Sequence, residues 1–70
     1  MQTYYKPTVY QICIDGHLNE HWMRWFEGYK VTQVEDGNTV ISGVMDQAAL
    51  HGLLNRIRDL GLELISVKRS

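Results

Sequence analysis

The fold is decided by residues 39–67, TVISGVMDQAALHGLLNRIRDLGLELISV, a stretch whose pattern predicts a strand, a helix and a strand joined by almost no loop. In the middle of this stretch large apolar residues recur at steps of three and four, which is typical of a helix with one apolar stripe. Asp46 is a suitable N-cap because its carboxylate accepts from free amides of the first turn, and Gly61 suits the C-terminal cap. We therefore predict a helix over residues 47–60. The stripe comprises Leu50, Leu53, Leu54, Ile57 and Leu60.

The residues before this stretch predict a second set of short elements. Residues 8–14 indicate a strand, with Tyr10, Ile12 and Ile14 on one face and Val9, Gln11 and Cys13 on the other. Asn19 is placed to cap a short helix over residues 20–27. Strands are expected over residues 29–35, 38–44 and 62–68, the first two of them joined by a tight turn at Asp36-Gly37. The apolar face of the short helix is expected to consist of Trp22, Trp25 and Phe26.

The resulting element order is β-α-β-β-α-β, the split βαβ or ferredoxin-like pattern of the α+β class. This pattern implies a four-stranded antiparallel sheet with spatial order 4-1-3-2 and two helices on one face. We expect residues 1–7 to form an N-terminal tail and residues 8–70 to form one ferredoxin-like domain.

The segment DQAALHGLLNRIRDLGLELISV, together with Trp22, Trp25 and Phe26 upstream, resembles a family of small uncharacterised bacterial proteins. The resemblance covers most of the chain beyond residue 8. It implies a compact stand-alone domain, and it carries no catalytic residue to transfer.

Length and composition limit the classes of protein that fit. A 70-residue chain buries only about 60% of its unfolded surface, so its stability is marginal without a disulfide, a metal or a partner. Cys13 is the one cysteine and no metal-ligand spacing is present, which leaves a homodimer as the expected source of extra burial. Seven basic and eight acidic side chains give a net charge of −1, which argues against a nucleic-acid partner. The apolar runs are too short to cross a membrane, so we predict no membrane association. The N-terminus lacks the apolar core of a signal peptide and the chain has a single thiol, which together predict a cytoplasmic location.

A sheet with both helices on one side leaves its other face open, and apolar residues remain there in either register. Val9 and Cys13 come from the first strand, and Ile65 and Val67 from the last strand if Leu62 and Leu64 point inward. The third strand adds either Val40 and Val44 or Ile41. These side chains are either scattered surface aliphatics or a face that pairs with another subunit, and the small size of the chain favours pairing.

The outer side of the long helix carries a mid-helix glycine, Gly52, in line with Ala48, Asn55 and Asp59. A glycine there costs about 1 kcal/mol relative to alanine. Two explanations stay open. Gly52 allows the backbone of a partner to approach closely, or it is tolerated in a helix held by its leucines.

Candidate chemistry is sparse. His17, His21 and His51 do not predict a metal site, since antiparallel helices separate His51 from His17 and no cysteine or carboxylate completes a ligand set. Aromatic residues between the first helix and the sheet are either core or the lining of a ligand pocket, and core is favoured. The candidate ligand-binding residues are His17, His21, Trp22 and Tyr29. No catalytic residue, metal ligand or cofactor is predicted.

The leading functional hypothesis is a small non-enzymatic module, for interaction or for regulation by ligand sensing, that forms a homodimer through its sheet. A different protein is a further candidate partner. The predicted interface residues are Val9, Cys13, Ile65, Val67 and Gly52. The alternative is a small cofactor-free enzyme with a pocket between helices and sheet or at the dimer cleft. In that case acid–base groups would come from His17, His21, Tyr10 or Tyr29.

Overall fold

The computed structural model describes residues 8–34 and 37–69. The chain alternates strands with two helical segments, the first of which continues into a 3₁₀ turn. The expected tail, residues 1–7, lies outside the described residues. The elements are β1 (Thr8–Asp15), α1 (Glu20–Met23), η1 (Arg24–Phe26), β2 (Lys30–Gln33), β3 (Asn38–Met45), α2 (Gln47–Asp59) and β4 (Leu64–Arg69).

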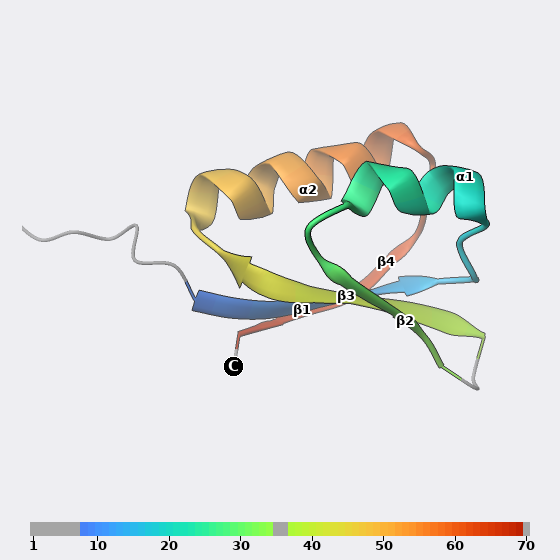
Figure 1. Cartoon of the computed structure of the whole chain (residues 1–70), viewed down its shortest axis with the longest axis horizontal. Helices are drawn as coiled ribbons and strands as arrows, with labels where there is room; N and C mark the ends of the chain where they lie inside the picture. The colour runs from blue at the N-terminus through green and yellow to red at the C-terminus, as the bar shows by residue number, and fades with distance from the viewer. Residues whose placement is uncertain (1–7, 35–36, 70) are drawn as a thin grey trace, which may run out of the picture.

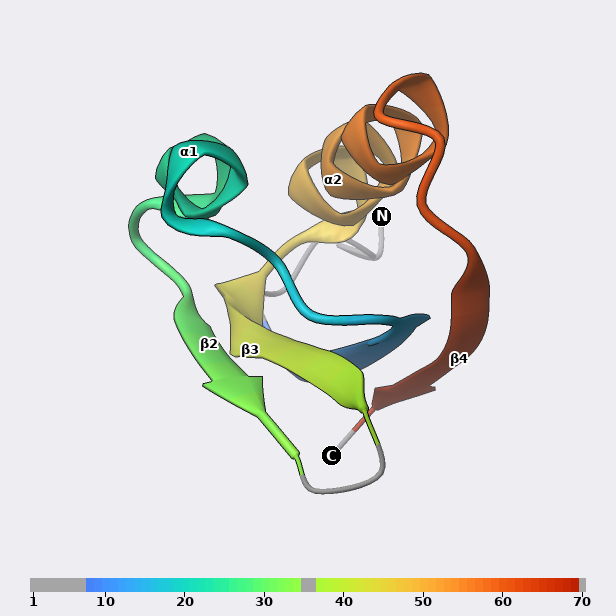
Figure 2. The same ribbon diagram turned by 90° about the vertical axis from the view of Figure 1, so that its right-hand side faces the viewer.

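The strands form one four-stranded antiparallel sheet, so the α+β class is confirmed. Neighbouring strands follow the order β2-β3-β1-β4. Read from the β4 edge, the same set of neighbours is 4-1-3-2. Both helical segments lie on one side of the sheet, and no helix of the described residues covers the other side (Figures 1 and 2).

The long helix begins and ends at local signals in the sequence. Asp46 Oδ1 accepts a hydrogen bond from the Ala49 amide at 2.8 Å, which caps the first turn of α2. At the other end Gly61 has φ +74°, a conformation that suits glycine after a helix. The predicted helix over residues 47–60 is therefore confirmed, with Leu60 as its C-cap.

The first helical segment differs from the prediction of a helix over residues 20–27. Asn19 Oδ1 does accept from the Trp22 amide at 3.0 Å, but α-helix ends at Met23 and a 3₁₀ turn follows. Because a 3₁₀ helix has three residues per turn, Met23 and Phe26 lie above one another on the side that faces the core. Phe26 is 1% exposed, whereas Trp25 is turned outward and is 45% exposed. The expectation that Trp25 belongs to the buried face was wrong for this reason.

The last strand starts two residues later than predicted, at Leu64 rather than residue 62. Leu62 is still part of the helix ending, because its amide donates to the Ile57 carbonyl at 3.1 Å. β2 is also shorter than expected, and its hairpin to β3 closes with the Val34 amide donating to the Asn38 carbonyl at 2.9 Å. Of the predicted turn pair, Gly37 has φ +87°, and Asp36 lies outside the described residues.

The core lies between the helix layer and the sheet. Ile12 and Ile41 face each other across β1 and β3, and both are fully buried. Thr39 is also fully buried. Its hydroxyl donates a hydrogen bond to the Gly16 carbonyl at 2.7 Å, so this buried polar group has a partner. The buried apolar residues are Tyr10, Ile12, Ile14, Leu18, Phe26, Ile41, Met45, Leu50, Leu53 and Ile57.

Candidate functional site

The strand register decides which side chains lie on the open face of the sheet. Residues directly opposite each other in an antiparallel pair point to the same side. Since Ile12 and Ile41 are buried under the helices, their chain neighbours face the other way. Cys13 is opposite Val40, and Val9 is opposite Val44. We call these four residues (Val9, Cys13, Val40 and Val44) the central patch.

The central patch is unevenly covered within one chain. Val44 is 64% exposed and Val9 is 38% exposed, whereas Cys13 and Val40 are half-buried. A polar row separates the two pairs of the patch, because Gln11 and Ser42 lie opposite each other between them, and Lys30 and Lys68 continue this row on the outer strands. The open face therefore carries two apolar pairs on its central strands, with one polar pair between them.

The β4 residues of the predicted interface do not join the central patch. Val67 is opposite Ile12, on the helix side of the sheet, rather than beside Cys13. The pairing register of β1 and β4 shifts between Cys13 and Ile14, and this bulge leaves Ile65 without a partner in β1. Leu64, Ile65 and Val67 are 44%, 50% and 38% exposed along the edge of the sheet.

Both edges of the sheet have features that oppose pairing with another strand. β4 is bulged and ends in Lys68 and Arg69, and β2 has only four residues and begins with Lys30. Short strands, bulges and edge lysines are the common devices by which proteins prevent edge-to-edge association. Any sheet-mediated contact is therefore favoured on the open face over the edges.

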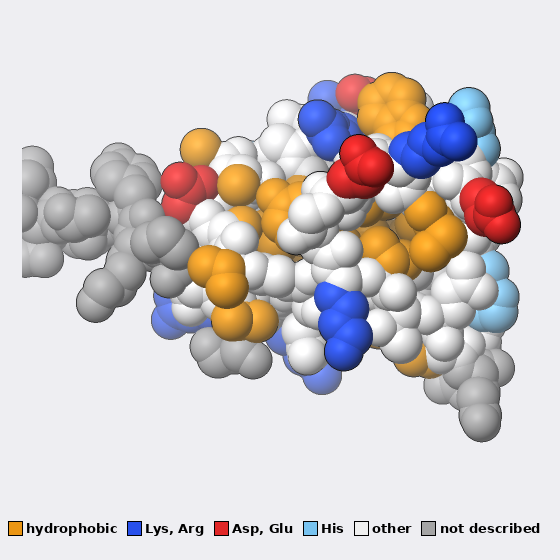
Figure 3. All heavy atoms as spheres, in the orientation of Figure 1, with side chains coloured by type: hydrophobic (Ala, Val, Ile, Leu, Met, Phe, Trp, Pro, Cys, Tyr) orange, Lys and Arg blue, Asp and Glu red, His pale blue; other side chains and the backbone are white. Residues whose placement is uncertain are grey.

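A groove of about 230 Å³ lies on the helix side, between α2 and the residue that leads into β2. Its lining residues are Tyr29, Ala49, Gly52, Leu53 and Arg56. We call it the Tyr29 groove. Hydrophobic side chains reach the surface between charged groups on the side of the molecule shown in Figure 3.

Two glycines shape the Tyr29 groove. A Cβ on Gly43 would lie 2.7 Å from Tyr29 Cδ1, so the absence of a side chain at Gly43 lets the Tyr29 ring lie against β3. Gly52 is exposed in α2, and apart from its chain neighbours and the adjoining helix backbone no atom of the described residues lies within 4 Å of a Cβ built there. Gly43 therefore positions the aromatic ring, and Gly52 leaves the space above it open.

Arg56 stands at one end of the groove in a fixed orientation. Its Nη1 donates to the Trp25 carbonyl at 2.7 Å, and its Cζ lies 6.0 Å from the centre of the Trp25 ring, a cation–π distance. The one ion pair among residues 8–34 and 37–69 joins Arg58 Nε to Asp59 Oδ1 at 3.9 Å. The Arg56 guanidinium is thus not neutralised by a carboxylate in the described part of the chain.

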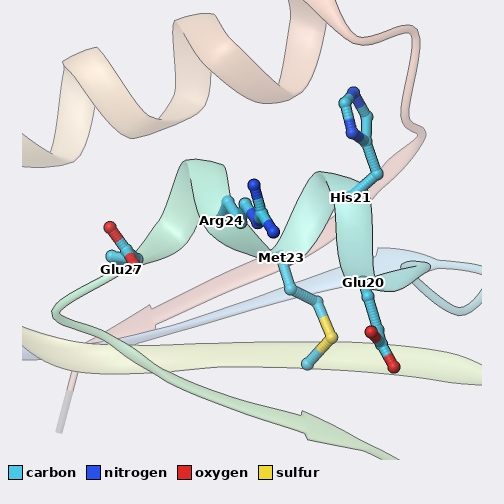
Figure 4. A pocket seen from close by; sticks show the side chains of 5 residues that line it. All are labelled: Glu20, His21, Met23, Arg24 and Glu27. Carbon is cyan, nitrogen blue, oxygen red and sulfur yellow. The ribbon is translucent and has the colours of Figure 1, made fainter.

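A larger hollow of about 520 Å³ runs along the outer side of α1 and η1. Figure 4 shows its side chains diverging, with Glu20 and Met23 directed toward the sheet side and His21 directed away from it. Because the polar groups do not converge, this hollow is a poorer candidate than the Tyr29 groove despite its size. Its lining residues are Glu20, His21, Met23, Arg24 and Glu27.

The predicted histidine and tyrosine candidates lie in separate places. His17 Nε2 is 3.3 Å from the Val34 carbonyl, and the His21 ring contacts the edge of Trp22 at 5.2 Å between centroids. Tyr10 is buried, and its hydroxyl accepts from Gln47 Nε2 at 2.7 Å. In the described ranges no three His, Cys, Asp or Glu side chains gather where they would hold a metal ion.

Of the four predicted ligand-binding residues, the groove contains Tyr29 alone. Trp22 is half-buried against the core, with its ring 6.4 Å from that of Trp25. Sequence reasoning missed Ala49, Leu53 and Arg56, which share one flank of α2 with Gly52 at steps of one and three. That spacing is visible in the sequence, but only the position of Tyr29 identifies the flank as the wall of a groove.

The comparisons with known proteins identify a family without an assigned function. A family model described as a domain of unknown function, DUF8691, matches residues 9–68, and the chain belongs to this family. No curated protein and no solved structure matches the chain. None of the helices in the described residues has both the length and the apolar character needed to cross a membrane.

Proposed function

We propose that this protein is a non-enzymatic interaction module that forms a homodimer through the open face of its sheet. The observation that carries the proposal is the pair Val9 and Val44, which lie opposite each other on the two central strands and are exposed in the single chain. Isolated surface valines are ordinary, but here the half-buried Cys13–Val40 pair lies on the same face.

The proposed dimer contact is face to face rather than edge to edge. Pairing of two open faces buries the central patch together with the Gln11–Ser42 pair that divides it, and it keeps Lys30 and Lys68 of the outer strands at the polar rim. Edge pairing would require a second chain to accommodate the β4 bulge and two adjacent cations. The small size of the chain supports the need for additional burial.

We further propose that the domain is ferredoxin-like. The β-α-β-β-α-β order, with β1 between β3 and β4, is the arrangement expected of a split βαβ fold. A bacterial origin and a cytoplasmic location also remain proposals, supported by the sequence resemblance and by the lone cysteine. Binding of a different protein to the same face is the competing outcome of the test below.

The experiment is light scattering coupled to size exclusion over a series of micromolar concentrations. We expect the wild type to be a dimer and Val44→Asp and Cys13→Asp to be monomers with unchanged circular dichroism. Because Val44 is exposed in the single chain, its substitution removes the contact without emptying the core. Val67→Asp, at an exposed valine on the other side of the sheet, is the matched control and should remain dimeric. A monomeric wild type at all concentrations would contradict the proposal.

A further inference from the structure

We propose that the Tyr29 groove is a binding site for a small monocarboxylate with an apolar body, whose carboxylate pairs with Arg56. This inference goes beyond the proposed dimer and does not depend on it, because the groove lies on the helix side of the sheet and the central patch lies on the open side. Four features of the groove support it: its free space, its floor, its cation and its size.

The free space comes from Gly52. A mid-helix glycine costs about 1 kcal/mol relative to alanine, and the packing of the single chain does not require it, since nothing described lies within 4 Å of a Cβ there. Ala49 and Leu53 add small and apolar walls on the same flank of α2. The missing side chain therefore leaves an apolar hollow that a ligand group can fill.

The floor of the groove is rigid. Tyr29 packs against the core, and its ring lies on Gly43, where there is no room for even a methyl group. An aromatic ring that is already immobilised loses little conformational entropy when a ligand packs on it. The groove is thus preorganised for a flat or branched apolar body.

The cation selects the charge of the ligand. Arg56 is held by the Trp25 carbonyl and ring, and a guanidinium carries five N–H donors, of which this hydrogen bond uses one. The planar fork of arginine matches the geometry of a carboxylate, which it can bind through two parallel hydrogen bonds. With no carboxylate paired to Arg56 in the described residues, the groove complements an anion.

The size of the groove limits the ligand to one small molecule. At about 230 Å³ it lies below the range of roughly 300–1,000 Å³ that is usual for drug-sized ligands. A compound with one carboxylate and a short branched or aromatic body satisfies these limits. Phenylacetate, benzoate and 3-methylbutanoate are suitable probes of this class.

The test is a titration of the ¹⁵N-labelled full chain with each probe, followed by amide chemical shifts and by tryptophan fluorescence. We expect saturable shifts at Gly52, Leu53 and Arg56 below about 10 mM, a weak affinity typical of so small a ligand. Phenylacetamide, which has the shape of phenylacetate without its charge, should bind at least about tenfold more weakly, as expected for the loss of a charge-assisted pair.

Three variants separate the groove from nonspecific binding. Gly52→Leu places a side chain in the groove, and its Cβ meets no other atom there, so it should retain the fold, as judged by its unfolding midpoint, and abolish the shifts. Arg56→Gln should weaken phenylacetate about tenfold and leave phenylacetamide unchanged, whereas Arg58→Gln, an exposed cation on the same helix, should bind as the wild type does. Absence of saturable shifts with all three probes, or wild-type binding by folded Gly52→Leu, would overturn the proposal. Equal losses in Arg56→Gln and Arg58→Gln would also overturn it.

Discussion

Gly43 and Gly52 are both glycines inside regular elements, yet an added side chain meets opposite surroundings at the two positions. At Gly43 the ring of Tyr29 occupies the space, and at Gly52 the space is empty. The sequence alone ranks both as weak points of an element, because a glycine there costs backbone entropy in folding. Only the packing distinguishes a glycine required by a neighbour from one that the single chain does not need.

Gly52→Ala should increase the free energy of unfolding by about 1 kcal/mol, since alanine is the better helix former and the new methyl contacts nothing. Urea denaturation followed by circular dichroism at fixed protein concentration measures this change. A destabilised Gly52→Ala would mean that α2 has an unrecognised close contact at this position.

Gly43→Ala should instead reduce the free energy of unfolding by about 1–3 kcal/mol, the usual cost of overpacking, because the methyl would lie 2.7 Å from Tyr29 Cδ1. The same substitution in a Tyr29→Ala background should cost much less, because the obstructing ring is gone. The double-mutant cycle therefore reports the contact directly. Equal costs of Gly43→Ala in both backgrounds would show that Tyr29 is not the obstacle.

For single residues, the sequence predicts where a helix is capped better than it predicts which side chains are buried. Asn19 and Asp46 were identified as caps because capping depends on residues within one turn, and both caps are present in the structure. The exposure of Trp25 was not predictable in this way. It depends on the change from α to 3₁₀ geometry after Met23, which rotates each later side chain about the helix axis.

At the scale of elements, α2 was predictable and the segment of α1 and η1 was only partly so. α2 has a cap at each end and a stripe that spans its whole length, so local and tertiary signals agree. The four residues of α1 and three of η1 are too short for an independent helix, and the segment is fixed by the burial of Phe26. Its exact form is therefore set by the core rather than by its own sequence.

Because the core fixes this segment through Phe26, the two neighbouring aromatic residues should contribute unequally to the free energy of unfolding. Phe26→Ala should cost about 3–5 kcal/mol in the free energy of unfolding, because it empties a fully packed site beneath η1. Trp25→Ala should cost much less, since nearly half of its side chain is exposed. Thermal and urea unfolding of the two variants, with Trp25→Phe as a conservative control, measures the ratio. A larger loss in Trp25→Ala would contradict the assigned packing.

The strands, too, were only partly predictable from the sequence. Alternation along residues 8–14 identified the buried face of β1, but it left the registers of β3 and β4 undecided, because both alternating sets of β3 are apolar. The pairing of Ile12 with Ile41 decides β3, and the bulge after Cys13 places Val67 on the helix side. A one-residue irregularity of this kind moves whole sets of side chains, and no local sequence signal marks it.

For the whole molecule, the structure separates two surfaces with different chemistry. The open sheet face has two apolar pairs divided by a polar row, and the helix side has a small groove next to an arginine. The class and the order of elements were predictable because hydrophobic period and turn residues determine them. The Tyr29 groove was not, because it joins Tyr29 to a flank of α2 that is distant in sequence.

If two chains meet through the open face of the sheet, as proposed above, methyl groups of one chain must contact those of the other. In a sample that mixes ¹³C-labelled and unlabelled chains, isotope-filtered nuclear Overhauser spectra report only contacts between chains. We predict intermolecular contacts among the methyl groups of Val9, Val40 and Val44, since these valines lie on the open face. Intermolecular contacts confined to Leu64, Ile65 and Val67, or no intermolecular contact at all at millimolar concentration, would contradict the proposed open-face dimer.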